Sequence, residues 1–344
     1  MTLPFFFDFN LSELVKHPVF ADQPDYRAMQ VWQQVYTKLK FDPMQINNVP
    51  LELRRKMKDA FDFEPVTVAQ KVSGEGNQAE KIAFNLSDGA KIETVLMRYT
   101  ERNTICISTQ VGCGMGCVFC ATGQMGFTRN LETAEIVGQV MYFAKILREE
   151  GSALTNIVIM GMGEPFVNYD AVLKSIDILN DPDGFQFGER RITISTVGIV
   201  PMIEKFTLAK RQINLAVSLH APTNAIRDKI LPINKTYPIE KLLIACNDYA
   251  KYTKRRISFE YALIDGVNDS LEDATQLAHL LKGMLCHVNL IPLNPTRNYG
   301  GKGTKSDHVK AFYSTLTRAG IPCSIRISRG VEIGAGCGQL VNKA

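Results

Sequence analysis

From residue 131 onward, helical segments alternate with short apolar runs, and this regularity constrains the fold more than any other feature of the chain. Strand-like runs lie at 156–161, 191–197, 213–219, 256–263, 287–293 and 323–328. Helical periodicity lies near 131–148, 170–180, 201–210, 238–253, 270–283 and 306–319. Strands joined through helices run parallel, so the pattern predicts an α/β fold of about six repeats, either a partial barrel or an open sheet. In both folds the chemistry lies at the carboxyl ends of the strands.

Other patterns precede and follow these repeats. Residues 1–62 carry apolar positions at helical spacing and predict a small helical domain, with Trp32 in its core. Residues 63–105 change to alternating apolar and polar positions, which predicts a β extension that enters the core in antiparallel fashion. We expect the α/β core to span 106–320 and a C-terminal segment, 321–344, to follow it.

Composition sets broad limits on function. The 344-residue chain is 45% hydrophobic and 22% charged, which is typical of a globular enzyme. A net charge of +4 permits nucleic-acid binding without requiring it, and the basic residues are scattered in several clusters. The first ten residues, MTLPFFFDFN, lack the pattern of a signal peptide, and no 18 apolar residues run together. We therefore expect a cytoplasmic protein that does not enter a membrane.

Three of the eight cysteines, Cys113, Cys117 and Cys120, lie in the glycine-rich stretch GCGMGCVFC. The stretch follows a predicted strand at 104–108, and its glycines let the backbone wrap closely around a bulky group. Structural zinc needs four protein ligands, and only Cys106 in the preceding strand could be recruited as the fourth. A [4Fe–4S] cluster takes one thiolate per iron, so three cysteines would leave one iron open to a further ligand. We favour the cluster.

Further motifs follow the predicted strands or lie near the C-terminus. They are MGMGEP at 160–165, ST at 195–196, SLHAP at 218–222, LPINK at 231–235, NP at 294–295 and AGCGQL at 335–340. Together with the cysteine spacing, they resemble radical S-adenosylmethionine RNA methyltransferases, and specifically the dual-specificity 23S ribosomal and transfer RNA adenine-C2 methyltransferase family. The resemblance covers essentially the whole chain. It implies a partial (β/α)6 barrel preceded by the helical domain and the β extension.

The resemblance also assigns a cofactor site. Cys113, Cys117 and Cys120 would hold one [4Fe–4S] cluster, whose open iron binds S-adenosylmethionine. The residues that would contact S-adenosylmethionine are Gly163, Glu164, Ser195, Ser218, Leu219, His220 and Asn294. Taken singly, Ser195 or Asn294 would be read as a turn residue that satisfies its own backbone.

The implied reaction passes through Cys337 on the C-terminal segment. Carbon 2 of adenine is electron-poor and does not attack a sulfonium methyl group, so a radical route is needed. One S-adenosylmethionine would methylate Cys337, and a second would supply the radical that makes this methyl group add to carbon 2. Glu93 would accept the proton from carbon 2, and Cys106 would release the product through a transient disulfide with Cys337. The glycines around Cys337 predict a mobile segment.

The implied partners are 23S ribosomal RNA, modified in the peptidyl-transferase centre, and transfer RNA, modified at the adenosine 3′ to the anticodon. An electron donor such as flavodoxin is implied as well, and we expect a monomer. The nearest alternative is methylation of carbon 8 of the same ribosomal adenosine, although Pro165 resembles the C2 group. Two other classes are an iron–sulfur redox protein that uses Cys106 and Cys337 as a dithiol, and a non-catalytic RNA-binding module. The first would not need Gly163 and Glu164, and the second would leave the cluster cysteines idle.

Overall fold

The computed structural model describes residues 3–326 and 328–341, and its centre is one ten-stranded sheet. The strands are β1 (Thr67–Ser73), β2 (Ala79–Asn85), β3 (Lys91–Arg98), β4 (Asn103–Cys106), β7 (Asn156–Ile159), β8 (Ile192–Thr196), β9 (Asn214–Ser218), β10 (Ile257–Leu263), β11 (Cys286–Pro292) and β12 (Cys323–Ile325), with β5 (Gln110–Cys113) and β6 (Gly126–Asn130) in a separate pair. The helices are α1 (Leu11–Val15), α2 (Tyr26–Tyr36), α3 (Leu51–Ala60), α4 (Ala121–Gln124), α5 (Thr133–Glu149), α6 (Tyr169–Asn180), α7 (Val200–Leu208), α8 (Asn224–Ile230), α9 (Ile239–Thr253), α10 (Leu271–Leu281) and α11 (Ser306–Arg318). Within the described residues, no helix combines the length and the apolar character needed to cross a bilayer.

The sheet is parallel from β4 to β12 and curls into a partial barrel. Each neighbouring pair in this part is parallel, and α5, α6, α7, α9, α10 and α11 form the successive crossovers. Thr104 on β4 and Ser324 on β12 line the same cavity although their strands are far apart in the sheet. The predicted partial (β/α)6 barrel is therefore confirmed, and an open sheet is excluded.

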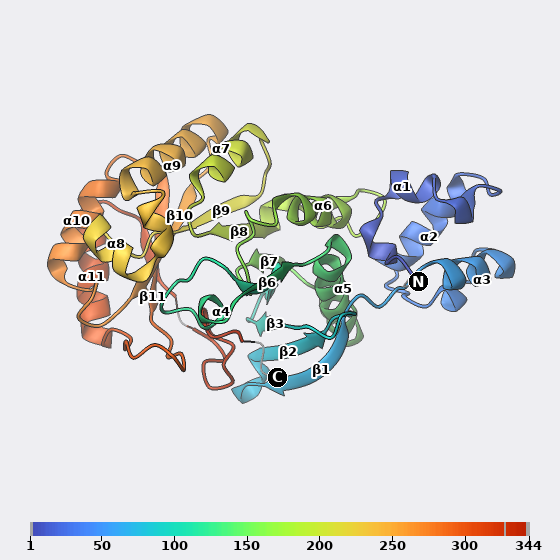
Figure 1. Cartoon of the computed structure of the whole chain (residues 1–344), viewed down its shortest axis with the longest axis horizontal. Coiled ribbons are helices and arrows are strands. Elements are labelled where there is room, and N and C mark those ends of the chain that lie inside the picture. The colour runs from blue at the N-terminus through green and yellow to red at the C-terminus, as the bar shows by residue number, and fades with distance from the viewer. Residues whose placement is uncertain (1–2, 327, 342–344) are drawn as a thin grey trace.

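The antiparallel strands β1, β2 and β3 extend this sheet beyond β4, as the alternating sequence predicts. The C-terminal segment, red in Figure 1, returns to this extension within the described residues. Lys81 on β2 donates from Nζ to the backbone oxygen of Gly334 at 3.2 Å. The C-terminal segment therefore crosses from β12 to the first strands of the sheet.

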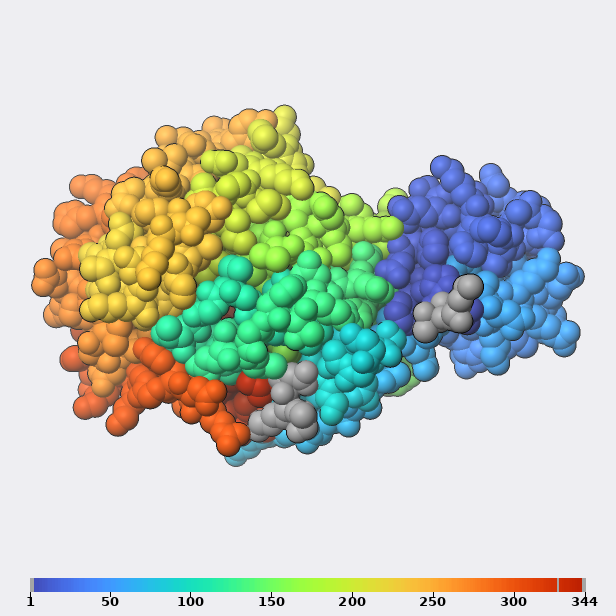
Figure 2. Space-filling model, viewed as in Figure 1, coloured from blue at the N-terminus to red at the C-terminus, as the bar shows by residue number. Residues whose placement is uncertain are grey.

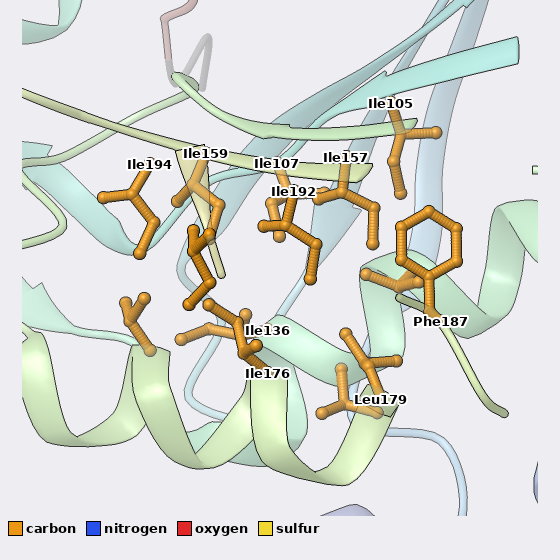
Figure 3. Packing of buried hydrophobic residues seen from close by; sticks show 14 of the residues in the cluster. Ile105, Ile107, Ile136, Ile157, Ile159, Ile176, Leu179, Phe187, Ile192 and Ile194 are labelled. Atoms are coloured by element: carbon orange, nitrogen blue, oxygen red, sulfur yellow. The ribbon is translucent and has the colours of Figure 1, made fainter. Parts of the chain in front are cut away.

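The outer face of the parallel strands is apolar and packs on helices. Figure 3 shows isoleucines of β4, β7 and β8 pointing toward α5 and α6. The labelled residues include Ile105, Ile157, Ile159, Ile192 and Ile194 on strands and Ile136, Ile176 and Leu179 on helices, and each of these is at most 1% exposed. Burying such a side chain stabilises the fold by about 1.5–3 kcal/mol. Because side chains alternate along a strand, the intervening residues, such as Thr193 and Ser195 of β8, face the barrel interior.

Residues 3–62 form a small helical lobe, joined to the barrel by a narrow waist in Figure 2. Trp32 on α2 is fully buried, as the sequence predicts. Its Nε1 donates to Asp181 Oδ1 at 3.1 Å, and Thr37 Oγ1 donates to the backbone oxygen of Gly184 at 3.0 Å. The lobe is thus attached to the loop that follows α6.

A buried hydrogen-bond network connects α5 to the strand ends. Gln139 donates from Nε2 to Ser108 O at 3.0 Å, and its Oε1 accepts from Ser108 N at 2.8 Å and from Thr94 Oγ1 at 2.6 Å. Ser108 Oγ in turn donates to Glu93 O at 2.6 Å and accepts from Met162 N at 2.9 Å. One glutamine therefore fixes β3, the end of β4 and the loop after β7 relative to one another.

Replacing Gln139 by Leu tests this network. The substitution keeps the volume but leaves the hydroxyl of Thr94 and the backbone groups of Ser108 without partners. Because each such group costs about 1–3 kcal/mol, we expect the free energy of unfolding in urea to fall by about 3 kcal/mol. Gln33→Leu, at an exposed position of α2, is the matched control and should change it by less than about 0.5 kcal/mol. Equal stability of the two variants would refute the role of Gln139.

Candidate active site

The three cysteines of the glycine-rich stretch lie around one cavity at the carboxyl ends of the parallel strands. Cys113 ends β5, Cys117 lies in the following loop and Cys120 directly precedes α4, and all three line the cavity. Other lining residues come from the ends of the barrel strands and include Glu164, Ser195, Ser218, Ala262 and Asn294. The unusual residues of the sequence thus meet at the edge where the fold class predicts chemistry.

Two glycines allow this loop to lie close to its neighbours. Gly112 has φ +75°, and a Cβ there would overlap the backbone oxygen of Gly126 in β6. Gly163 after β7 has φ +106°, and its Cβ would lie 2.6 Å from Cβ of Gln110. Only glycine fits at these positions, because other residues would be strained and would clash. The cysteine loop and the loop after β7 can therefore share one wall of the cavity.

Three thiols that line one cavity are a donor set that could hold an iron–sulfur cluster. Among residues 3–326 and 328–341, no group of three His, Cys, Asp or Glu side chains is placed to hold a metal ion. Zinc requires ligands that converge on one point, whereas the thiolates around a cluster each bind a different iron. Burial raises the pKa of Cys113 to about 12 and raises that of Cys117 well above its usual value. These thiols are therefore neutral until a metal displaces their protons.

Glu164 provides a buried carboxyl group beside the cysteines. It is 4% exposed, its Oε2 accepts from Val197 N at 2.8 Å, and its Oε1 accepts from Phe166 N at 3.1 Å. Burial raises the pKa of this carboxyl to about 7, although the two N–H donors favour the charged form. In its charged form it is suited to accept hydrogen bonds from an ammonium group.

The structure brings six of the seven predicted cofactor-binding residues to this cavity. They are Gly163, Glu164, Ser195, Ser218, His220 and Asn294. Leu219 is fully buried behind the cavity, where its N–H donates to Glu260 O and its oxygen accepts from Arg227 Nε at 3.1 Å. Leu219 thus supports the wall through its backbone, and its side chain does not line the cavity.

His220 is neutral. Its Nδ1 accepts from Ala262 N at 2.8 Å, so the ring proton is on Nε2. Burial, and then the charge of Arg227, lower the pKa of this imidazole to about 3. The ring lies edge-on to Phe119 of the cysteine loop, with centroids 5.0 Å apart. His220 therefore connects the end of β9 to the loop and keeps an N–H donor available.

The C-terminal segment brings Cys337 to the same cavity as the three loop cysteines. Cys337 has accessible surface, yet surrounding protein atoms raise the pKa of its thiol. Both observations agree if the accessible surface faces the cavity and not the bulk solvent. The Cys337 thiol therefore forms part of the cavity lining.

Hydrogen bonds anchor the described part of this segment. Asn294 Nδ2 donates to Cys337 O at 3.0 Å, Ala121 N to Gly338 O at 2.8 Å, Thr122 Oγ1 to Leu340 O at 2.7 Å, and Gln339 Nε2 to Pro295 O at 2.9 Å. In the described arrangement the glycines permit tight turns that are held by these bonds, and the mobility of the segment stays a prediction.

Cys106 ends β4 behind the cavity and is a free thiol. Burial raises the pKa of Cys106 to about 12; Cys337 raises it further, and Arg326 opposes the shift. The two cysteines that the resemblance pairs thus lie within electrostatic range of each other.

Glu93 lies outside the cysteine cavity. It is 5% exposed on β3, its Oε1 is 2.9 Å from Lys81 Nζ, and its Oε2 accepts from Val341 N at 2.9 Å. Gln339 and Val341 line the cavity that contains Glu93, whereas Gly338 and Leu340 line the cysteine cavity. The C-terminal segment is therefore the wall between the two.

Sequence reasoning missed Glu260 and Arg326, which lie within electrostatic range of the Cys337 thiol. Glu260 on β10 is 5% exposed, its Oε1 accepts from Asn289 Nδ2 at 2.8 Å, and its Oε2 lies 3.8 Å from Arg326 Nη1. It lines both the cysteine cavity and a larger cavity of about 970 Å³ in the barrel interior. The available signal was a lone carboxylate in the apolar strand sequence ISFEYALI.

The raised pKa of Glu164 predicts a pH dependence of stability in the metal-free chain. The folded state binds this proton more tightly than the unfolded state, with a pKa of about 7 against 4.5, so stability rises as the pH falls through this range. The full contribution is about 3 kcal/mol, at about 1.4 kcal/mol per pH unit. Glu164→Gln should lose this part of the slope when urea unfolding is measured between pH 8 and 5. Parallel slopes for the two proteins would contradict the assignment.

Comparisons with known proteins agree with this geometry. Residues 107–278 match the radical SAM superfamily model. A Chloroflexus aurantiacus protein named "Probable dual-specificity RNA methyltransferase RlmN" is 44% identical over 98% of this chain and 92% of its own length. A protein of the same name from Dictyoglomus thermophilum is 49% identical over 92% of this chain and 91% of its own length.

A solved structure, described as a radical SAM methyltransferase from Sphaerobacter thermophilus, superposes on the fold with a TM-score of 0.97. It is 46% identical and covers 99% of this chain and 100% of its own. The motif resemblance is thereby confirmed, and a pure redox protein or a non-catalytic binding module is excluded. The chain belongs to the radical SAM superfamily and, within it, to the RlmN family, and is an S-adenosylmethionine-dependent RNA methyltransferase.

Proposed function

We propose that the chain methylates carbon 2 of an adenosine in the peptidyl-transferase centre of 23S ribosomal RNA and of the adenosine 3′ to the anticodon in transfer RNA. The observation that carries the proposal is the position of Cys337 in the cavity that holds Cys113, Cys117 and Cys120. A methyl carrier must reach the metal-bound cofactor, and a tail cysteine that lines this cavity is placed to do so. Each turnover consumes two molecules of S-adenosylmethionine.

Cys113, Cys117 and Cys120 hold the [4Fe–4S] cluster in this proposal, and Glu164, Ser195, Ser218, His220 and Asn294 bind S-adenosylmethionine beside it. Bound together, the cluster and cofactor supply the radical chemistry that an electron-poor carbon requires. The Glu164 carboxylate accepts from the cofactor's ammonium group, and Gly163 lets the cofactor approach the backbone. Leu219 contributes only by holding the cavity wall.

Cys337 carries the methyl group. As a thiolate it displaces the methyl from one S-adenosylmethionine, and S-adenosylhomocysteine leaves. The same carbon later bonds to carbon 2 of adenine, so RNA and protein are joined for part of the cycle. The Cys106 thiolate then attacks Sγ of Cys337, and the bond between Sγ and the methylene carbon breaks. Its electron pair goes to that carbon, which takes up a proton and becomes the methyl group of the released RNA, and the disulfide that remains is reduced by an external thiol.

Glu93 accepts the proton from carbon 2. In the described arrangement its Oε2 is bonded to Val341 N and the C-terminal segment separates it from the cysteines. Entry of the adenine must therefore displace this segment, which frees Glu93 Oε2 and opens the wall between the two cavities. The proton acceptor is thus exposed only when substrate is present.

Pro165 follows Glu164 on the cavity wall and resembles the C2 group, so we place methylation at carbon 2 in preference to carbon 8. We propose that the helical lobe and the scattered basic loops bind RNA phosphates. We further propose a flavodoxin-type electron donor, a monomeric state and a cytoplasmic location.

Nucleoside analysis tests the proposed function directly. Anaerobically reconstituted enzyme is incubated with a reductant, methyl-labelled S-adenosylmethionine and either a 23S ribosomal RNA fragment or unmodified transfer RNA. The digests should contain labelled 2-methyladenosine from both substrates. Labelled 8-methyladenosine would establish the carbon-8 alternative, and absence of label from RNA would overturn the proposal.

Substitutions of Cys337 and Cys106 should stop the methylation reaction at different stages. Cys337→Ala should abolish RNA methylation, with at least a thousandfold loss, while still binding S-adenosylmethionine, because only the carrier is missing. Cys106→Ala should accumulate a covalent protein–RNA adduct, visible as a shifted band on a denaturing gel. Cys246→Ala, in the buried core, is the control for loss of a thiol. Free turnover by Cys106→Ala would show that Cys106 does not resolve the adduct.

A further inference from the structure

The guanidinium of Arg227 on α8 is fully buried and surrounded by neutral acceptors. Its five hydrogen bonds run from Nε to Leu219 O (3.1 Å), from Nη2 to Val197 O (2.8 Å) and Ser218 O (3.1 Å), and from Nη1 to Asn234 Oδ1 (2.9 Å) and Tyr237 O (3.4 Å). None of these acceptors carries a charge. Arg227 is thus held in one place with its positive charge uncompensated by its hydrogen-bond partners.

Burying a cation without an anion is costly, and the cost is visible at Arg227. Desolvation lowers the pKa of its guanidinium to about 10, so the group remains charged at neutral pH but is destabilised. The groups that oppose this shift are, in order, the thiol of Cys117, the thiol of Cys246 and the carboxylate of Asp228, which is exposed. Cys117 is therefore the first of the potential anions for Arg227, and Cys246 lies in the buried core.

The cysteine loop lies directly against the helix that carries Arg227. Val118 N donates to Ile230 O at 3.1 Å, and a Cβ at Gly116 would be 3.6 Å from Cγ of Pro232. Cys117 itself packs on the apolar cluster that contains Ile230. Figure 1 shows α4 and the loop before it on the side of the barrel that carries α8. The positive charge of Arg227 therefore acts on Cys117 of the loop through protein and not through solvent.

We propose that Arg227 is a positioning residue that supplies the compensating positive charge for the cysteine thiolates of the cluster and thereby makes the bound cluster easier to reduce. This inference rests on the proposed cluster site. Three thiolates and a reduced cluster concentrate negative charge in a buried place, and a fixed cation nearby stabilises the more negative state. Arg227 does not line the cavity, so it acts on the metal site from behind the wall.

The LPINK motif, to which no other role is assigned, fits this inference. Asn234 of the motif is 1% exposed and offers Arg227 an amide oxygen, while its own Nδ2 donates to Asp228 Oδ1 at 2.7 Å and to Asn224 Oδ1 at 3.0 Å. An aspartate at position 234 would also accept from the guanidinium, but it would cancel the charge of Arg227 and would set a carboxylate oxygen against Asp228 Oδ1 in place of the Nδ2 donor. An amide satisfies the hydrogen bond and leaves the charge available to the thiolates.

Potentiometric titration of the reconstituted cluster, followed by electron paramagnetic resonance, tests the proposal. Arg227→Met removes the charge, and we expect the ratio of reduced to oxidised cluster at a fixed solution potential to fall about tenfold, which is about 59 mV for one electron. Arg227→Lys keeps the charge but not the hydrogen-bond pattern. The reduction potential of its cluster should stay close to that of the wild type. Its midpoint of thermal unfolding should fall together with that of Arg227→Met.

Asn234→Asp applies the same test without removing Arg227, and Asn234→Ala is its matched control. Asn234→Asp should lower the reduction potential of the cluster as Arg227→Met does, and Asn234→Ala should leave that potential unchanged. Loss of the cluster from Arg227→Met with retention in Arg227→Lys would also support a role of charge. If Arg227→Lys matches Arg227→Met in potential or in cluster loss, or if Asn234→Asp titrates as the wild type, the proposal is wrong. A wild-type chain that assembles no cluster would instead overturn the proposed function.

Discussion

The structure depends on a division between the two faces of its parallel strands. On the outer face, isoleucines of β4, β7 and β8 are buried against α5 and α6, as in any parallel sheet covered by helices. On the inner face, the alternate residues are polar, for example Thr193 and Ser195 on β8 and Glu260 on β10. A partial barrel with a polar interior buries less apolar surface than a barrel filled with apolar side chains. Its stability therefore depends on the apolar layer between the strands and the outer helices. In exchange, donors and acceptors from many strands face one interior.

The C-terminal segment completes this interior. An incomplete barrel leaves an opening between β12 and the first strands, and the segment crosses it with bonds to Lys81 and Glu93 on one side and to Asn294 on the other. The same segment carries Cys337. Because its residues alternate between two cavities, a displacement that exposes Glu93 also moves the thiol. Cys337 and Glu93, the proposed methyl carrier and proton acceptor, are thereby coupled through one short stretch of backbone.

Much of this arrangement was predictable from sequence, because its signals are local. The alternation of strand-like runs and helices predicted parallel strands, and the motif resemblance indicated a partial barrel in preference to an open sheet. The glycines around Cys113, Cys117 and Cys120 indicated a loop that wraps closely. The positions of Cys106 and Cys337 relative to each other depend on how the sheet curls, which no periodicity encodes. Arg227 is similar, since its sequence neighbourhood is an ordinary amphipathic helix and its burial becomes apparent only when β8 and β9 end beside it. Glu93 differs from both, because its role was assigned only through the family resemblance. Taken alone it would be read as a solvated strand residue, yet it is 5% exposed.

Two guanidiniums serve the two groups of thiols in different ways, and the difference follows the charge that each group must carry. Arg326 interacts electrostatically with Cys106 and Cys337, and the Glu260 carboxylate nearby balances it. In the proposed reaction that pair of cysteines passes between thiol, thioether and disulfide, which are all neutral, so a balanced surrounding suits every resting state. Arg227 faces Cys117 without a carboxylate among its hydrogen-bond partners. Thiolates that remain charged while metal is bound need a permanent opposite charge, and a cation held by carbonyl groups provides it without competing for the metal.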